Sequence, residues 1–301
     1  MSDPDGQYVD DLASHLEPMV TVMLELVDAA LDLAPPSGLP AADSQAMAER
    51  AVEDKYANEH WPEPVRAAHA VTGVLVFAAG DHIRSYARLF ASEPVPVYTH
   101  LAIARAALDA AGTAYWLADT GISDETRIMR YEVTRLMSAV ECKRSPMPSA
   151  KAKSQEIVDN VRAGAAPHGW TVNRSNPHCG NQEEPRPKQL IRRVLEDDAI
   201  FGPDAPGIAT VLWWYLSGVT HSASYALMQS VKITDDAPNA APGETMAAIS
   251  TSSQSVFMMG LTAARGYAAA VQEHAQLMGW SSERWDAARK ALADLGATLA
   301  D

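Results

Sequence analysis

The chain has 301 residues, of which 47% are hydrophobic and 21% charged, a composition that supports a folded core rather than a disordered chain. Its 24 Lys+Arg and 38 Asp+Glu give a formal net charge of -14, which disfavours a general electrostatic attraction to nucleic acid or to an anionic membrane. Two cysteines, Cys142 and Cys179, are too few for a disulfide framework and fit a reducing compartment.

The first residues, MSDPDGQYVDDL, lack the basic and apolar regions of a secretory signal. The longest apolar stretches, residues 70–80 and 206–219, are shorter than the ~18–20 residues that span a bilayer and are expected to form buried core helices. We therefore expect a soluble, cytoplasmic protein without a membrane partner.

Apolar residues in the first half of the chain recur at three- and four-residue steps. This pattern predicts helices over residues 8–33, 42–58, 62–92, 97–119, 123–143 and 150–163. Pro18 predicts a kink or a break in the first helix, and the mixed charges of residues 42–58 predict a solvated outer helix. Gly73 and Gly80 lie one heptad apart and predict the close approach of a neighbouring helix.

Residues 164–186 contain Gly, Pro, Asn and Ser with little periodicity and predict a long irregular loop, with one extended piece near residues 170–172. The remaining pattern predicts helices over residues 187–197, 207–232, 244–277 and 281–299. The sequence as a whole predicts one all-α domain over residues 1–301, a bundle of long antiparallel helices with short peripheral helices around it.

Known cofactor and metal motifs are missing from the sequence. There is no Gly-rich phosphate loop, no G-x-S-x-G elbow, no Glu-x-x-His pair and no His-Glu-x-x-His. His168, His178, Cys179 and Cys142 do not match a zinc-finger spacing. We therefore predict no cofactor and no metal site, and an exposed loop with incidental His and Cys.

The helix predicted over residues 207–232 carries polar groups on an otherwise apolar surface. Ser217 and His221 lie four residues apart on one face, which Trp214 extends by one turn. They are candidate catalytic or pocket-lining residues; alternatively, His221 is a core histidine bonded to Ser217 or to a backbone carbonyl. Since no acidic residue follows in this helix, local sequence does not support a Ser-His-acid triad.

Charged residues within the central helices form a second group of candidates. Arg105 and Asp109 have the four-residue spacing of a helical ion pair. These two residues could join Asp81, Arg130 and Glu132 in a network between helices that binds an anion or a polar ligand; alternatively, most such pairs are exposed and contribute little. Together with the aromatic surfaces that could stack a planar ligand, the candidate ligand-binding residues are Trp116, Arg105, Asp109, Arg130, Glu132, Trp214, Ser217 and His221.

Residues 104–119 (ARAALDAAGTAYWLAD), 127–141 (RIMRYEVTRLMSAVE) and 215–226 (YLSGVTHSASYA) resemble a group of uncharacterised actinobacterial helical proteins. The last segment also resembles helical domains grouped with HEPN-like proteins. Active HEPN ribonucleases have an Arg and a His separated by four to six intervening residues, but no Arg lies within reach before His221. The formal match is Arg162 with His168, at a predicted helix end. The resemblance therefore implies a helical scaffold more than an activity.

Three functions are consistent with the sequence. The first, which we favour, is binding of, or action on, a small polar or planar molecule in a pocket between the helices that carry Trp116, Arg130 and His221. The second is a structural or interaction protein without catalysis, such as a homodimer formed through the Gly73/Gly80 face or through the terminal helices. The third is a HEPN-like ribonuclease or toxin-type protein, which the acidic net charge disfavours.

Overall fold

The structure is a computed structural model, and it describes residues 4–90, 97–196, 205–228, 231–234, 246–249 and 253–297. Over these residues the chain is all-α apart from two small sheets, as predicted. The α-helices are α1 (Pro4–Leu31), α2 (Gln45–Arg50), α3 (Pro64–Leu89), α4 (Thr99–Ala118), α5 (Asp124–Arg144), α6 (Pro148–Ala165), α7 (Pro187–Glu196), α8 (Ala205–Thr220), α9 (Ser224–Leu227), α10 (Ser253–Met278) and α11 (Glu283–Ala297).

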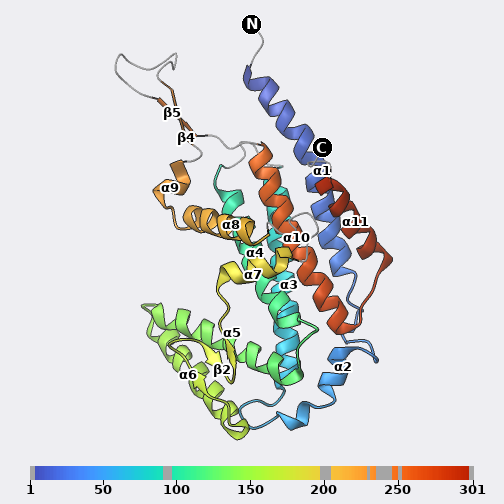
Figure 1. Cartoon of the computed structure of the whole chain (residues 1–301), viewed down its shortest axis with the longest axis vertical. Helices are drawn as coiled ribbons and strands as arrows, with labels where there is room; N and C mark the ends of the chain where they lie inside the picture. The colour runs from blue at the N-terminus through green and yellow to red at the C-terminus, as the bar shows by residue number, and fades with distance from the viewer. Residues whose placement is uncertain are drawn as a thin grey trace.

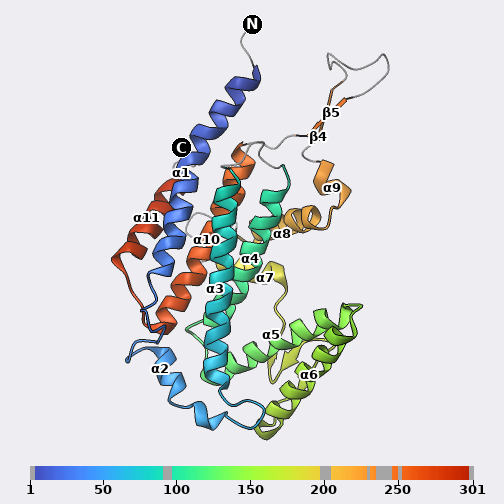
Figure 2. The same ribbon diagram turned by 180° about the vertical axis from the view of Figure 1, so that it is seen from behind.

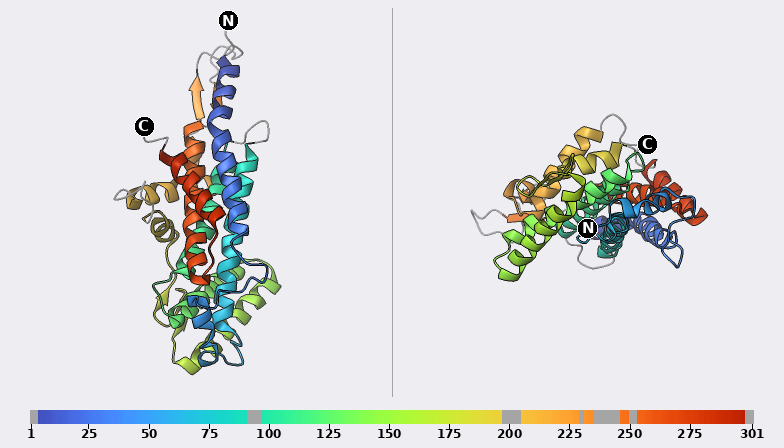
Figure 3. Two further views of the ribbon diagram at one scale, coloured as in Figure 1. Left: turned by 90° about the vertical axis from the view of Figure 1, so that its right-hand side faces the viewer. Right: turned by 90° about the horizontal axis from the view of Figure 1, so that it is seen from below.

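The bundle is elongated, and helices α3, α4 and α10 run through its middle (Figure 1). Helices α1 and α11 pack side by side along one flank, and the view from behind shows α7 and α8 on the other (Figure 2). Helices α5 and α6 pair with each other at one end of the long axis, beyond the main bundle (Figure 3). This end of the molecule has its own core. No helix among the described residues is long and apolar enough to cross a membrane.

Small residues on α3 allow α10 to approach closely, as predicted from Gly73 and Gly80. A Cβ atom at Gly80 would lie 2.9 Å from the Tyr267 hydroxyl, and one at Gly73 would lie 3.6 Å from the imidazole of His274. Since a Cβ contact under about 3 Å requires a shift of the neighbouring side chain, Gly80 is required for this packing. The face that could have joined two copies of the chain is thus occupied by α10 of the same chain.

Two expectations for the N-terminal part are corrected. Helix α1 continues through Pro18 rather than breaking there; this proline lies on the exposed side of the helix, where water can bond the carbonyl that it leaves free. The predicted outer helix over residues 42–58 is shorter, comprising α2 and a 3-10 turn, η1 (Glu53–Lys55). Glu49 and Glu53 within it are buried rather than solvated, because each has partners from other elements.

The helix predicted over residues 207–232 ends at Thr220 instead. Ser222 adopts a left-handed φ of 53°, its N–H donates to the carbonyl of Val219, and the N–H of Ala223 donates to that of Gly218. These bonds form a Schellman motif, which terminates the helix. The strands β4 (Val231–Thr234) and β5 (Met246–Ile249) then pair antiparallel, where the sequence had predicted the end of one helix and the start of the next.

The segment predicted as an irregular loop, residues 164–186, is partly ordered. It contains the end of α6, a 3-10 turn η2 (Ala166–His168) and an antiparallel sheet of three two-residue strands, β1 (Val172–Asn173), β2 (His178–Cys179) and β3 (Gln182–Glu183). Cys179 is fully buried in this sheet, which corrects the expectation of an exposed loop. The predicted helix ends at residues 91–92, 197, 229–230, 244–245 and 298–299 lie outside the described residues.

A second hydrophobic core holds α5, α6 and the small sheet against the start of α3. Trp61 lies at its centre, in the loop before α3, and its indole lies parallel to the His168 ring with centroids 6.0 Å apart. The buried members are Tyr56, Trp61, Val65, Trp116, Leu117, Ile128, Met129, Val133, Leu136, Ala139, Val158, Val161, Ala165, Cys179 and Leu190. This core fixes the position of the site described below.

Replacing Gly164 by alanine is expected to lower the free energy of unfolding by about 1–3 kcal/mol, because its Cβ atom would overlap the buried indole of Trp61. The matched control is Gly207→Ala, since a Cβ atom at that helical position meets no other atom within 4 Å. This control is expected to be neutral or slightly stabilising. Urea denaturation of the two variants measures both effects; equal stabilities would contradict the packing of Trp61 on Gly164.

Candidate functional site

The structure distributes the predicted site residues over separate places. Arg105 and Asp109 form the predicted pair on α4, with Nε 3.0 Å from Oδ2, and the guanidinium lies over the ring of Trp213 on α8, 5.4 Å from its centroid. Buried atoms of the three residues, Arg105 Nη1, Asp109 Oδ1 and Trp213 Nε1, have no hydrogen-bond partner among the described residues. The pair therefore joins α4 to α8 rather than to α5.

Trp116 and Arg130 meet at the end of α4, as the first functional hypothesis expected. Arg130 lies over the Trp116 ring at 5.2 Å, and its Nη1 donates to the Trp116 carbonyl at 2.5 Å and to Asp119 Oδ2 at 3.0 Å. Arg130 Nε donates to Gln182 on β3 at 3.2 Å. These contacts tie the C-terminus of α4 to α5 and the small sheet.

The residues predicted on α8 do not lie on an interior face. His221 is exposed and lies at the C-cap of α8, with its backbone N–H donating to the carbonyl of Ser217 at 3.0 Å. Trp214 is 52% exposed and Ser217 is half-buried. A pocket formed by Trp116, Arg130 and His221 together is therefore not found, because the helix ends before it can place the imidazole inside.

The predicted network of charges between helices is also not formed. Asp81 is exposed, while Arg105, Arg130 and Glu132 each have a different partner, namely Asp109, Asp119 and Arg135 respectively. Of these ion pairs, that of Glu132 with Arg135 combines a buried charged group with an open cavity. We therefore take the cavity beside Glu132 as the candidate site.

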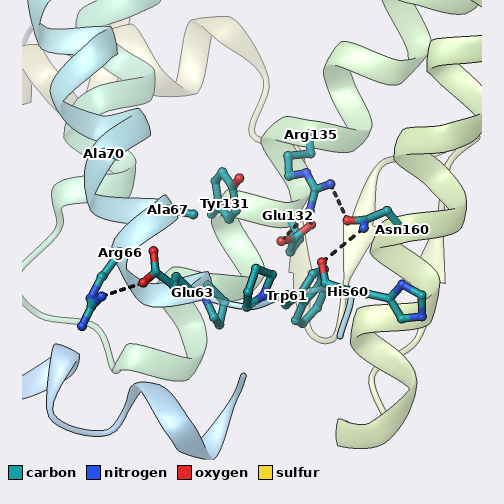
Figure 4. A pocket seen from close by; sticks show the side chains of 12 residues that line it. His60, Trp61, Glu63, Arg66, Ala67, Ala70, Tyr131, Glu132, Arg135 and Asn160 are labelled. Carbon is teal, nitrogen blue, oxygen red and sulfur yellow. Dashed lines mark hydrogen bonds and ion pairs between the residues drawn. The ribbon is translucent and has the colours of Figure 1, made fainter. Parts of the chain in front are cut away.

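Glu132 and Arg135 lie in the wall of a cavity of about 520 Å³ between α5, α6 and the start of α3 (Figure 4). Arg135 Nη1 donates to both carboxylate oxygens of Glu132, at 3.0 and 2.8 Å, and its Nη2 donates to Asn160 Oδ1 on α6 at 2.5 Å. Asn160 Nδ2 in turn donates to the carbonyl of His60 at 3.2 Å. A continuous chain of hydrogen bonds thus crosses the floor of the cavity.

The local sequence of α5 positions Glu132 and Arg135 in this wall of the cavity. Ser123 caps the helix by accepting a hydrogen bond from the N–H of Thr126 at 3.2 Å, and acidic Asp124 and Glu125 in the first turn favour the helix dipole. The three-residue spacing of Glu132 and Arg135 then brings their side chains onto neighbouring positions of the helix surface.

The opposite wall is the start of α3 and the loop before it. Pro64 occupies the first turn of α3, and Glu53 of η1 caps the helix from a distance by accepting the N–H of Val65 at 2.7 Å. Asn58 Oδ1 accepts the N–H groups of His60 and Trp61, each at 3.0 Å, which fixes the loop. The residues lining the cavity are His60, Trp61, Pro62, Glu63, Pro64, Arg66, Ala67, Ala70, Tyr131, Glu132, Arg135 and Asn160.

Burial changes the acidity of the groups in this wall. It raises the pKa of Glu132 to about 7, although the charge and the hydrogen bonds of Arg135 act in the other direction. Burial also raises the pKa of Tyr131, so its hydroxyl stays protonated at neutral pH. Burial and, in addition, the charge of Glu132 raise the pKa of the Cys179 thiol to about 12. A carboxyl that titrates near neutrality in a cavity is typical of a functional site.

The arrangement offers hydrogen-bond donors to a ligand. A guanidinium has five N–H groups. Arg135 uses no more than three of them in its hydrogen bonds to Glu132 and Asn160, so at least two remain for a ligand. The guanidinium also lies 5.8 Å from the centre of the Tyr131 ring, which helps to hold its plane. Apolar atoms of Ala67 and Ala70, with the buried Trp61 behind the lining, complete the cavity surface.

Sequence reasoning named Glu132 as a candidate but did not place Arg135, Trp61 or Asn160 among the candidate residues. The spacing of Arg135 is a signal that could have paired it with Glu132. Trp61 and Asn160 carry no such signal, since Asn160 is 100 residues from its partner His60 and Trp61 belongs to a loop.

A second buried cluster, also missed, joins α2, α3, α4 and α5. Glu49 accepts hydrogen bonds from His69 Nε2 at 2.8 Å and from Arg127 Nε and Nη2 at 2.9 and 3.0 Å. Arg127 also donates to the carbonyls of Leu117 and Asp119 at the end of α4. Burial alone would raise the pKa of Glu49, but the hydrogen bonds of His69 and Arg127 outweigh it and lower the pKa to about 2. We interpret this cluster as structural.

The described contacts give little support to a metal site or to a HEPN-like ribonuclease. No group of three or more His, Cys, Asp or Glu suited to a metal occurs among the described residues. Arg162 is exposed, whereas His168 bonds the Tyr56 carbonyl at 3.2 Å and packs on Trp61 and Trp170. Comparison of the chain with models of protein families, with curated proteins and with solved structures gives no match.

Proposed function

We propose that this protein binds a small polar molecule in the cavity between α3, α5 and α6. The observation that carries the proposal is the Glu132–Arg135 pair, a charged pair in the wall of a cavity of about 520 Å³ with guanidinium donors to spare. Cavities of this size hold small ligands, and a few convergent polar groups in an apolar lining typically fix their orientation.

A purely structural role accounts less well for these residues. Burying a carboxylate costs free energy even when it is paired, and an apolar pair of similar volume is often as stable. The chain therefore places an unfavourable group at the cavity wall, where a ligand could use it. The ribonuclease alternative would need a basic surface for phosphate, but this cavity also contains Glu63 beside Arg66, 2.6 Å apart.

A variant that fills the cavity tests the proposal. Ala67 is half-buried and lines the cavity, so Ala67→Trp is expected to occupy it and to weaken ligand binding at least about tenfold. Three probes of similar shape differ in charge: benzoate, benzamide and benzylamine. Binding is measured by ligand-detected NMR and by calorimetry.

The control is Ala152→Trp, which places the same side chain at an exposed position of α6 that does not line the cavity. Binding of at least one probe to the wild type and to this control, with loss in Ala67→Trp, supports the proposal. If none of the three binds, or if the Ala67→Trp protein binds them as the wild type does, the proposal is wrong.

A further inference from the structure

We infer that the ligand of this cavity carries a carboxylate, which pairs with Arg135 while Glu132 takes up one proton. The inference rests on the proposed function and goes beyond it by naming the chemical class of the ligand and the proton that accompanies it. It follows from what the cavity wall presents, from the count of charges around Arg135 and from the fixed position of the guanidinium.

Both residues of the pair line the cavity, but the cation is the more accessible of the two. The side chain of Arg135 is 24% exposed, whereas that of Glu132 is 1% exposed. Figure 4 shows Arg135 reaching from α5 toward Asn160, with Glu132 beside it. A ligand entering the cavity therefore meets the N–H groups of Arg135 first. A planar guanidinium with two free donors matches a carboxylate, which accepts two parallel hydrogen bonds.

The Tyr131 hydroxyl favours the same class of ligand, because it lines the cavity and is a donor at neutral pH. Arg66 is half-exposed and already paired with Glu63, so these two lining residues add no net charge. A cationic ligand would have to approach the Arg135 guanidinium to reach the buried carboxylate of Glu132. A ligand with a flat apolar part would in addition cover the apolar atoms of Ala67 and Ala70.

The proton follows from the charge count. When a ligand carboxylate pairs with Arg135, two carboxylates share one guanidinium, and the nearby like charge disfavours ionisation of both. Glu132 is the more buried of the two and accepts the proton from solvent. The one bond formed is the O–H bond of Glu132, with its proton taken from solvent: the free protein, the ligand anion and one proton give a complex in which Glu132 is a neutral acid.

The charged and titratable groups that line the cavity with Glu132 are Tyr131 and Arg135 on α5, His60 and Glu63 in the loop before α3, and Arg66 on α3. Cys179 on β2 also lies close enough to Glu132 for the two to interact. Among the described residues, α6 contributes the neutral amide of Asn160 to this lining. Glu132 itself has a pKa of about 7, which places its proton uptake in an accessible range.

The expected result is a pH-dependent affinity for benzoate. If only the protonated form of Glu132 admits the anion, a pKa of about 7 makes Kd at pH 8 about tenfold higher than at pH 6. Calorimetry at pH 8 in buffers of different ionisation enthalpy is expected to show uptake of close to one proton per benzoate bound. Benzamide is expected to bind with neither effect.

Variants of Glu132 and Arg135 test the role of each residue in benzoate binding separately. Glu132→Gln is expected to bind benzoate with the same Kd at pH 6 and pH 8 and without proton uptake. Arg135→Met is expected to raise the benzoate Kd by at least about tenfold and to change benzamide binding less. The matched controls, Glu141→Gln and Arg144→Met, change an exposed pair of the same spacing on α5 outside the cavity. They are expected to behave as the wild type.

Each remaining outcome is decisive. If benzamide or benzylamine binds in the cavity and benzoate does not, the proposed function stands and the inference is overturned. Benzoate binding with a constant Kd and no proton uptake also overturns it. If none of the probes binds, the proposed function fails as well. Because proton uptake is measured on the wild type, the test does not depend on the folding of any variant.

Discussion

Replacing Glu49 by alanine is expected to lower the free energy of unfolding by about 3–5 kcal/mol, the largest effect of any single substitution considered for this protein. The side chain is 6% exposed and accepts hydrogen bonds from His69, Arg127 and Gln45. Its removal leaves the guanidinium of Arg127 buried without a counter-charge. An unpaired buried charge costs far more than the loss of an exposed ion pair.

The loss of stability in Glu49→Ala extends beyond α2, because Arg127 also binds the end of α4. Its guanidinium bonds the carbonyls of Leu117 and Asp119, which end α4, and so connects α2, α4 and α5 through one group. These carbonyls have no partner within their helix, and Arg127 is the cation that satisfies them. Without Glu49 this connection loses the anion that makes burial of the guanidinium tolerable.

Urea denaturation of the Glu49→Ala protein measures the loss, and Glu156→Ala provides the control. Glu156 is 67% exposed and paired with Lys153 on α6, so its removal is expected to cost less than about 1 kcal/mol. The double variant Glu49→Leu with Arg127→Met is expected to be less destabilised than the sum of its two single variants, because it leaves no buried charge unpaired. Equal losses for Glu49→Ala and Glu156→Ala would show that the cluster does not hold these helices together.

The all-α class and most helices could be predicted from the sequence because they depend on local spacing. Helix α4 is found within two residues of its predicted start and α6 within two residues of its predicted ends. The end of α8 could not be predicted, since a left-handed Ser222 stops the helix without the glycine that usually marks such a stop. The three two-residue strands are also too short for an alternating pattern to appear.

The candidate site was predictable only as far as its contacts are local. The ion pair of Arg105 with Asp109 follows from spacing along one helix and is found. The bonds of Glu49, by contrast, join residues 20 and 78 positions apart, and nothing in a single sequence couples such positions. A charge-rich helix such as α2 predicts a solvated face until its tertiary partners are known. Glu132 was named as a candidate for the same reason as Asp81, which is exposed.

Two buried groups, His274 and Glu132, are expected to change the free energy of unfolding with pH in opposite directions. Variants of each residue are expected to reveal its separate contribution. His274 on α10 is buried, and its Nε2 has no hydrogen-bond partner within the part of the chain that the structure describes. Burial, together with the charges of His69 and Arg127, lowers its pKa to about 4. The unfolded chain, in which a His pKa is about 6.5, then binds the proton more readily than the folded protein. Stability due to His274 therefore falls as pH decreases from 6.5 to 4.

Glu132 has the opposite sign. Its pKa is raised to about 7 in the folded protein from 4.5, so the folded protein binds the proton more readily between these values. Stability due to Glu132 thus rises as pH decreases from 7 to 4.5. Each term amounts to about 3 kcal/mol in full and to about 2 kcal/mol between pH 7 and pH 5. In the wild type the two nearly cancel over this range.

Two variants are expected to show that the pH-dependent contributions of Glu132 and His274 cancel in the wild type. Glu132→Gln removes the rising term, so its free energy of unfolding should fall by about 2 kcal/mol more than that of the wild type from pH 7 to pH 5. His274→Leu removes the falling term, so its free energy of unfolding should rise by about 2 kcal/mol relative to the wild type over the same range. Urea denaturation at pH 7, 6 and 5 measures both slopes. Because each comparison is a difference in slope, the constant cost of either substitution drops out. Parallel curves for the three proteins would mean that neither side chain is held in the buried, neutral-favouring position that the structure gives it.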